Sequence, residues 1–257
     1  MLLLLLACVE QPLDATGDLT ESTFHSATLD DDYVLRLRTP PGYDGEPLPL
    51  IVQLDPTFAG LQEYDLTVGY ASQRAWPDAI VLGVDYPDPN TRLRDYTPDD
   101  TPDPAFDDAG ADTFYRVLRD EILPHVEADH PASRRIVVGH SNGGVFATYA
   151  ALRYDPDAPP LFDGFVSADF GIDRQMFTYL EWLVDRADDL PVRWYASRAV
   201  FNGAPQKIVH DALFGRVREA GFSSLALLTE ELETDHGGAV APSFDRGLAF
   251  VLAGEAP

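Results

Sequence analysis

Short apolar runs alternate with longer segments of helical period along most of the chain. Six runs bounded by proline, glycine or aspartate predict buried strands, at residues 50–54, 79–84, 135–138, 164–167, 192–196 and 225–228. Helical segments fall between them, at residues 66–75, 111–128, 142–154, 173–186, 208–220 and 243–252. This alternation predicts an α/β fold with a mostly parallel central sheet and helices on both faces.

The remaining segments set the predicted domain limits. Residues 24–38 carry short alternating patterns suited to antiparallel edge strands, whereas residues 9–22 are predicted to be a tether. A single domain over residues 23–257 follows. Residues 86–108 hold five prolines and seven aspartates without any period, so they are interpreted either as a functional loop or as a solvated acidic excursion.

The N-terminus predicts a lipid anchor. An apolar run over residues 2–6 precedes Ala7 and Cys8, so residues 1–8 resemble a bacterial lipoprotein signal. We expect a chain anchored through Cys8 on the periplasmic face of the envelope, with the outer membrane slightly favoured. The alternatives are a buried apolar segment with an incidental cysteine and a secreted or periplasmic protein. No later run reaches the length of a membrane span.

Charge and cysteine content narrow the function classes. The chain has 257 residues and a formal net charge of −25, which argues against binding nucleic acid or docking electrostatically on anionic lipid. Its single cysteine excludes an internal disulfide and a cysteine-based metal cluster. We expect no cofactor and no metal.

The strongest motif is Gly-His-Ser-Asn-Gly-Gly at residues 139–144. It follows a predicted strand and opens a predicted helix, as a nucleophile elbow requires. The sharp turn would expose the hydroxyl of Ser141, and the N–H of Asn142 at the helix start would face a developing oxyanion. The alternative is a structural glycine turn.

A serine nucleophile needs a base, and His236 is the candidate among six histidines. It follows the last predicted strand and precedes the last helix, where such hydrolases place the base. His140 lies inside the elbow and is expected to point elsewhere. Without the serine motif, His236 would be interpreted as an ordinary surface residue.

Together these segments resemble the putative-esterase (esterase D) group of α/β-hydrolases, in its enterochelin-esterase-like, siderophore-esterase-like branch. The resemblance covers residues 24–252, and its most specific piece is Arg-Leu-Arg-Asp-Tyr-Thr-Pro at residues 92–98. It implies the α/β-hydrolase fold and carboxylic-ester chemistry. The group commonly has Leu-Asp-Gly where this chain has Leu-Asp-Pro at residues 54–56, and the next residue, Thr57, would supply an oxyanion N–H because proline cannot.

The acid of the triad departs from that pattern. The resemblance places it after the strand at residues 192–196, yet residues 192–210 contain no Asp or Glu. Asp211 is the first carboxylate afterwards, and Asp169 and Asp235 are further candidates. We expect a Ser141–His236 dyad in preference to a displaced acid.

The predicted function is a serine carboxylic-ester hydrolase that acts on a small-molecule ester. The alternatives are a non-catalytic envelope binding lipoprotein that keeps the hydrolase fold and an acyltransferase that uses the same site. The sequence leaves the ester and the oligomeric state open.

Overall fold

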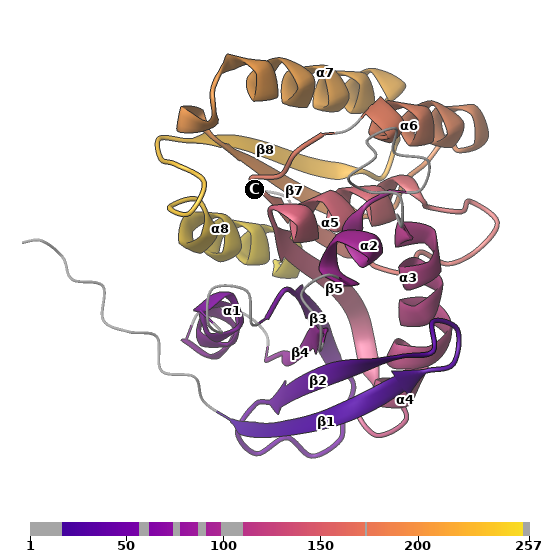
Figure 1. Cartoon of the computed structure of the whole chain (residues 1–257), viewed down its shortest axis with the longest axis vertical. Coiled ribbons are helices and arrows are strands. Elements are labelled where there is room, and N and C mark those ends of the chain that lie inside the picture. The colour runs from indigo at the N-terminus through magenta and orange to yellow at the C-terminus, as the bar shows by residue number, and fades with distance from the viewer. Residues whose placement is uncertain are drawn as a thin grey trace, which may run out of the picture.

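The computed structural model describes residues 17–56, 62–73, 78–86, 91–98, 110–172 and 174–253. In this part of the chain eight strands form one sheet and helices lie on both of its faces (Figure 1). The elements in chain order are β1 Asp18–Ser26, β2 Asp31–Thr39, β3 Leu48–Leu54, α1 Gln62–Gln73, β4 Ile80–Asp85, α2 Thr91–Tyr96, α3 Ala111–Val117, η2 Leu118–Ile122, α4 Leu123–Glu127, β5 Ala132–His140, α5 Asn142–Leu152, β6 Gly164–Ala168, α6 Arg174–Arg186, β7 Arg193–Ala199, η3 Val200–Asn202, α7 Ala204–Ala220, β8 Ala226–Leu232 and α8 Val240–Leu252.

The sheet has the strand order β1-β2-β4-β3-β5-β6-β7-β8. From β4 to β8 all neighbours are parallel, while β2 runs antiparallel to both β1 and β4. Residues of β4 and β6 are buried throughout, which is why those strands read as continuous apolar runs. The predicted α/β-hydrolase fold and its six strands are confirmed, except that β8 lies at the sheet edge and is only partly buried.

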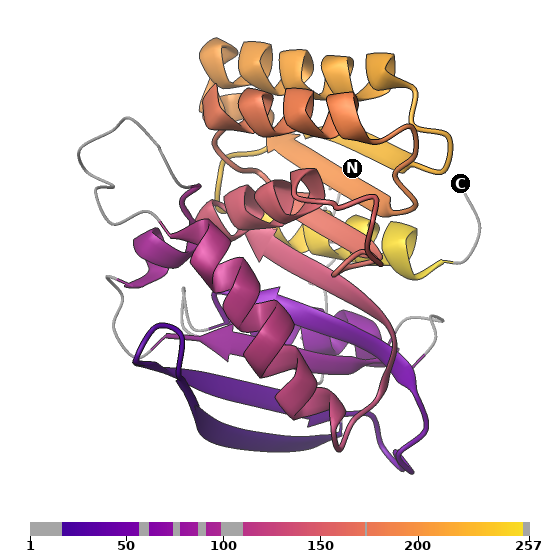
Figure 2. The same cartoon turned by 90° about the vertical axis from the view of Figure 1, so that its right-hand side faces the viewer.

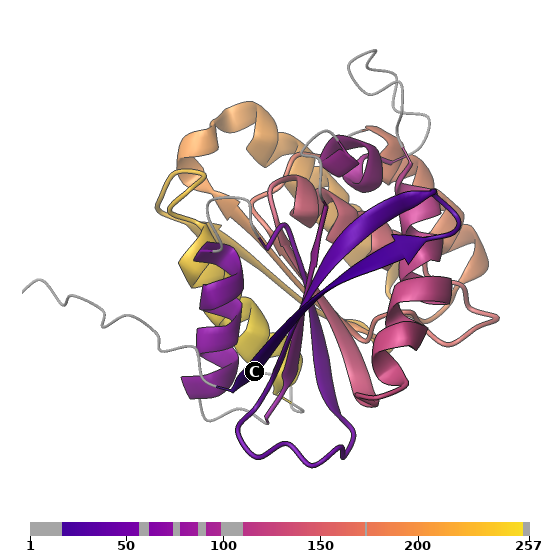
Figure 3. The same cartoon turned by 60° about the horizontal axis from the view of Figure 1, so that its bottom comes forward.

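Helices cover the two faces unequally. One face packs against α1 and α8, around Val68, Phe244 and Leu248. The other face packs against α3, α5, α6 and α7 (Figure 3), with Phe146 and Phe214 in its core. Figure 2 shows α6 and α7 side by side over the β7–β8 end of the sheet. Because β3 to β8 run parallel, their carboxyl ends lie along one edge of the sheet. Ligand sites form at this edge in such sheets.

Helix boundaries follow local chemistry. The predicted helix at 111–128 is one continuous helical stretch, α3–η2–α4, with a π-helical turn in its middle. Helices α7 and α8 begin earlier than predicted, at Ala204 and Val240. In α7, Pro205 occupies the first turn, where its missing N–H costs nothing.

Two predictions about irregular segments are corrected. The tether does not extend to residue 22, because β1 begins at Asp18 and pairs with β2 as far as Thr39. The side chains of β1 are mostly exposed on both faces, so its sequence lacks the apolar alternation that would predict a strand. The acidic segment at 86–108 contains a short helix, α2, which interactions distant in sequence hold in place. Cys8 lies outside the described residues.

The length and composition of the helices decide whether any of them could cross a membrane. Among the helices that the structure describes, none is long and apolar enough to span a bilayer.

Candidate active site

The elbow between β5 and α5 has the predicted geometry. Ser141 adopts φ 57° and ψ −121°, a conformation that a residue with a side chain rarely takes, and it caps the N-terminus of α5. Its N–H donates to the carbonyl of Ala168 at 3.0 Å, which ties the turn to β6. A Cβ on Gly139 would lie 2.3 Å from the carbonyl carbon of Gly143, so only glycine permits this close approach.

The N-terminus of α5 lies next to Ser141 and presents backbone N–H groups. Asn142 is the first residue of the helix, and N–H groups in the first turn have no partner within a helix. Together with the positive end of the helix dipole, that N–H suits a developing negative charge. Thr57, the other predicted oxyanion donor, lies outside the described residues, which stop at Pro56 on this side.

A buried ion pair holds the residue that precedes Pro56. Asp55 is fully buried, with φ 56°, and accepts two hydrogen bonds from Arg92, at 2.7 Å from Nε and 2.8 Å from Nη2. The hydroxyl of Tyr86 donates to it at 2.6 Å. Burial raises the pKa of Tyr86, and the negative charge of Asp55 raises it further. Asp55 also reaches the elbow, because a Cβ on Gly143 would lie 3.2 Å from its Oδ2.

The same α2 motif makes a second buried cluster. Arg94 donates to Asp95 at 2.7 Å and to Asp31 at 3.0 Å, and the hydroxyl of Tyr33 donates to Asp95 at 2.8 Å. Burial raises the pKa of Asp95, although Arg94 opposes that effect. The Arg-x-Arg-Asp-Tyr segment thus fixes α2 to β2 and to the end of β3, which explains its place in an otherwise irregular acidic stretch.

His236 lies on the loop between β8 and α8 and is bonded to a carboxylate. Its Nδ1 is 2.6 Å from Oδ2 of Asp169, which is fully buried and follows β6. Because a carboxylate only accepts, Nδ1 carries the proton, and Nε2 of the neutral ring is left as an acceptor. That tautomer is the one that a general base requires.

Three donors surround Asp169. Besides His236, the N–H of Ala199 donates to Oδ1 at 2.7 Å, and Nδ2 of Asn202 lies 2.8 Å and 2.6 Å from the two carboxylate oxygens. Burial by itself would raise the pKa of Asp169, but these hydrogen bonds lower it below its ordinary value. The carboxylate is therefore ionised and oriented toward the imidazole.

This pairing corrects the expectation of a dyad and the choice of Asp211. Asp211 lies exposed on α7 and pairs with Lys207 at 2.9 Å. Asp235 is exposed and accepts from the N–H of Gly238 at 2.8 Å. Asn202 occupies the loop where the acid was expected, and the carboxylate comes instead from the preceding strand end.

His140 was set aside on sequence and proves to support the site. It is buried, its Nε2–H donates to the carbonyl of His236 at 3.0 Å, and the two ring centroids are 4.3 Å apart. Its only sequence signal is its position between Gly139 and Ser141. The side chain positions the loop that carries His236.

One group among the described residues has the composition of a metal site. His140, Asp169 and His236 each offer a ligand atom within 4.8 Å of the others. Hydrogen bonds engage these side chains, since Asp169 accepts from His236 and His140 donates to a carbonyl. The arrangement matches a carboxylate that orients a histidine better than it matches a cation site.

Known proteins resemble this chain in sequence over part of its length and in structure over most of it. Residues 26–166 match the putative esterase family. No curated protein matches the chain. An IroE-like serine hydrolase from Shewanella oneidensis is similar in structure, with 20% identity, a TM-score of 0.76 and coverage of 90% of this chain and 79% of that one.

Two further solved structures cover nearly the whole of both chains. The siderophore hydrolase EstB from Aspergillus nidulans has 19% identity, a TM-score of 0.77 and coverage of 98% of each chain. The BES protein from Bacillus cereus has 18% identity, a TM-score of 0.78 and coverage of 95% of this chain and 98% of that one. With the family match over more than half of the sequence, the resemblance noted on sequence is confirmed, and the chain belongs to the putative esterase family, in the α/β-hydrolase fold.

Proposed function

We propose that this chain is a serine carboxylic-ester hydrolase with Ser141 as nucleophile, His236 as general base and Asp169 as the acid. The observation that carries the proposal is the hydrogen bond from His236 Nδ1 to the buried Asp169, made at the strand edge that also holds the strained elbow serine. A surface histidine has no need of a fully buried carboxylate with three donors. A base that becomes an imidazolium during turnover does need one.

The chemistry has two half-reactions. Nε2 of His236 accepts the hydroxyl proton as Ser141 Oγ attacks the ester carbonyl, and the tetrahedral intermediate collapses with loss of the alcohol, which takes that proton. Water then repeats the sequence on the acyl-enzyme, and Ser141 leaves with the proton from His236. Asp169 stays ionised and stabilises the imidazolium in both steps.

The oxyanion is assigned to two backbone N–H groups. Asn142 supplies the first from the start of α5, and Thr57 supplies the second from the chain that follows Pro56. Support for the Thr57 side comes from the buried Asp55–Arg92 pair, because it fixes the end of β3 against the elbow. Donors held rigidly before the reaction lose no free energy to reorganisation during it.

The substrate is a small-molecule ester, and its acyl and alcohol groups are a matter for assay. Some of the similar structures are of siderophore hydrolases, so a catecholate lactone belongs in the substrate panel beside short acyl, feruloyl and acetyl-sugar esters. Turnover of one ester at least about a hundredfold faster than of the others would name the class.

Labelling by a fluorophosphonate probe tests the proposal directly. The wild-type chain should be labelled at Ser141, whereas Ser141→Ala should be neither labelled nor active, and His236→Ala should be inactive with its fold intact by circular dichroism. An unlabelled wild-type chain would favour the non-catalytic alternative. Labelling without hydrolysis of any ester, but with transfer to an added alcohol, would favour an acyltransferase.

We also propose that Cys8 carries a lipid that anchors the chain on the periplasmic face of the envelope. The support is the apolar run followed directly by Ala7 and Cys8. Metabolic labelling with an alkyne analogue of palmitate should mark the wild-type chain and leave Cys8→Ser unmarked. Equal labelling of the two proteins would contradict the proposal.

A further inference from the structure

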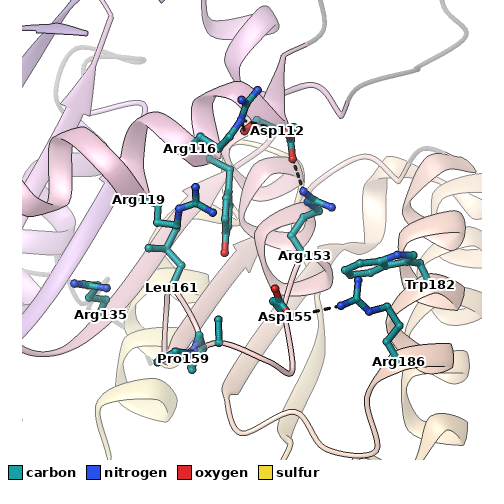
Figure 4. Close-up of a pocket in the computed structure, with 13 residues that line it drawn as sticks. Asp112, Arg116, Arg119, Arg135, Arg153, Asp155, Pro159, Leu161, Trp182 and Arg186 are labelled. Carbon is teal, nitrogen blue, oxygen red and sulfur yellow. Dashed lines mark hydrogen bonds and ion pairs between the residues drawn. The ribbon is translucent and has the colours of Figure 1, made fainter. Parts of the chain in front are cut away.

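A separate cavity of about 380 Å³ lies between α3, the end of α5 and α6. Figure 4 shows that its wall is rich in arginine, with Arg116 and Arg119 on one side and Arg153 and Arg186 on the other. Arg153 directly follows the last residue of α5, whereas Ser141 precedes the first. Eleven helical residues span about 16 Å, so the cavity lies at the far end of this helix from the elbow.

The charge of this cavity contrasts with that of the whole protein. Five arginines and two aspartates line it, and Asp120, Glu127 and Asp157 pair with three of these arginines from outside the lining. The surroundings of the cavity are therefore close to neutral, whereas the chain as a whole carries −25. The lining holds five of the 17 arginines in the sequence. Such a concentration offsets, at this place, the repulsion of anions that the net charge of the chain would otherwise cause.

The arginines keep hydrogen-bonding capacity for a ligand. Arg116 and Arg153 share the single carboxylate of Asp112. Arg186 lies 3.6 Å from a carboxylate oxygen of Asp155, which is longer than a hydrogen bond.

An aromatic side chain helps to position two of the guanidinium groups. The guanidinium carbon of Arg186 lies 4.4 Å from the ring centre of Trp182, and that of Arg153 lies 5.7 Å from it. Cation–π contacts of this kind orient a guanidinium while leaving its N–H edge available to anionic oxygens. A wall formed by residues 158–161, which includes two prolines, closes the opposite side.

We propose that this cavity binds a small organic anion with two or more anionic oxygen groups. Its volume falls in the range of organic ligand sites and exceeds what a simple ion fills. Guanidinium groups on two facing walls match a ligand charged at both ends, because each arginine presents a planar pair of donors to a carboxylate or a phosphate. The site is independent of the ester chemistry proposed above.

Calorimetric titration of the full chain at low ionic strength tests this site, with citrate as a tricarboxylate and fructose 1,6-bisphosphate as a phosphate ester. At least one probe should bind with a Kd below about 1 mM. Arg153→Gln and Arg119→Gln should each weaken that binding about tenfold, since each removes a charged hydrogen-bond donor. Arg119 is half exposed and pairs with neighbouring Asp120, so its loss leaves the fold intact. The stronger probe identifies the anionic group as carboxylate or phosphate.

Arg246→Gln is the matched control, because it removes the same charge from an exposed arginine on α8 outside the cavity. It should change Kd by less than about twofold. Failure of both probes to bind below about 10 mM would overturn the proposal, as would equal weakening by Arg246→Gln. Inorganic phosphate binding as tightly as the organic probes would overturn the two-ended ligand class.

Discussion

Two buried aspartates flank the nucleophile elbow and differ in their partners. Asp55 follows β3 and Asp169 follows β6, and these strands are the two neighbours of β5. Both side chains are fully buried and both backbones have positive φ, 56° and 37°. Asp55 is paired with Arg92, whose charge is permanent, whereas Asp169 is paired with His236, whose imidazole can accept and release a proton. A fixed cation makes the first pair structural, and a titrating partner makes the second suitable for catalysis.

The largest expected effect is on kcat and concerns Asp169. Asp169→Asn should lower kcat by about 10³- to 10⁴-fold, because the imidazole loses its orienting anion and its tautomer, while KM changes little. Asparagine is nearly isosteric, so the melting temperature should stay within a few degrees. Steady-state kinetics on an activated ester and a thermal melt measure both. A variant that keeps most of its activity would restore the dyad.

The second prediction tests how much the Asp55–Arg92 pair stabilises the fold. Arg92→Gln leaves the Asp55 carboxylate buried without its cation and should lower the free energy of unfolding by about 3–5 kcal/mol. Urea titration followed by circular dichroism measures the change. As a control, Arg92→Gln combined with Asp55→Asn should cost less than Arg92→Gln alone, since no unpaired charge remains. A single variant with unchanged stability would show that the pair is not structural.

A histidine without a carboxylate partner extends the comparison. His210 is buried among Phe170 and Phe214, and burial, with the charge of Arg198 as a further cause, lowers its pKa to about 4. Between that value and about 6.5 the unfolded chain binds more protons, so stability falls as pH falls through this window. The loss should approach about 3 kcal/mol below pH 4.

His210→Leu isolates that contribution. The variant should flatten the decline of unfolding free energy between pH 7 and 4, measured by urea titration at several pH values. Val217→Ala is the control, because it perturbs the buried face of the same helix without removing a titratable group and should leave the slope unchanged. Identical slopes in His210→Leu and the wild type would contradict the assignment.

The smallest effect concerns the residue that replaces an acid. Asn202→Ala removes one donor from Asp169 and leaves Ala199 N–H and His236 in place, so kcat should fall by about tenfold. Asn202→Asp should fall further, because two carboxylates at this distance cannot both be ionised near neutral pH. Kinetics at pH 8 compare them. An aspartate variant more active than the alanine variant would place the acid at residue 202.

The sequence predicted the fold and part of the site, for physical reasons. Buried strands and the elbow depend on local patterns, so the strands, Ser141 and the location of His236 on the β8–α8 loop were accessible. The partner of His236 was missed because the pairing depends on segments distant in sequence: Asp169 was visible after an apolar run, yet nothing local distinguished it from Asp211. Only the fold shows that Asn202 donates to it.

The hydrogen bonds that Arg92 and Tyr86 donate to Asp55 were missed for the same reason. Asp55 and Arg92 are 37 residues apart, and Arg92 lies in an acidic stretch without any period. The specific motif at residues 92–98 supported the family resemblance and gave no hint of what it contacts. His140 was dismissed because a neighbour of the nucleophile was assumed to point away, whereas the structure packs it against the loop of His236.

The backbone strain at this edge carries a thermodynamic consequence. Of the four non-glycine residues with positive φ in the described part of the chain, three are Asp55, Ser141 and Asp169. Each such conformation costs roughly 1–3 kcal/mol, which packing elsewhere must offset. Glycine would relax all three positions and remove the side chains on which the site depends. This protein is therefore expected to trade stability for activity at its strand ends, and substitutions that stabilise it there should impair turnover.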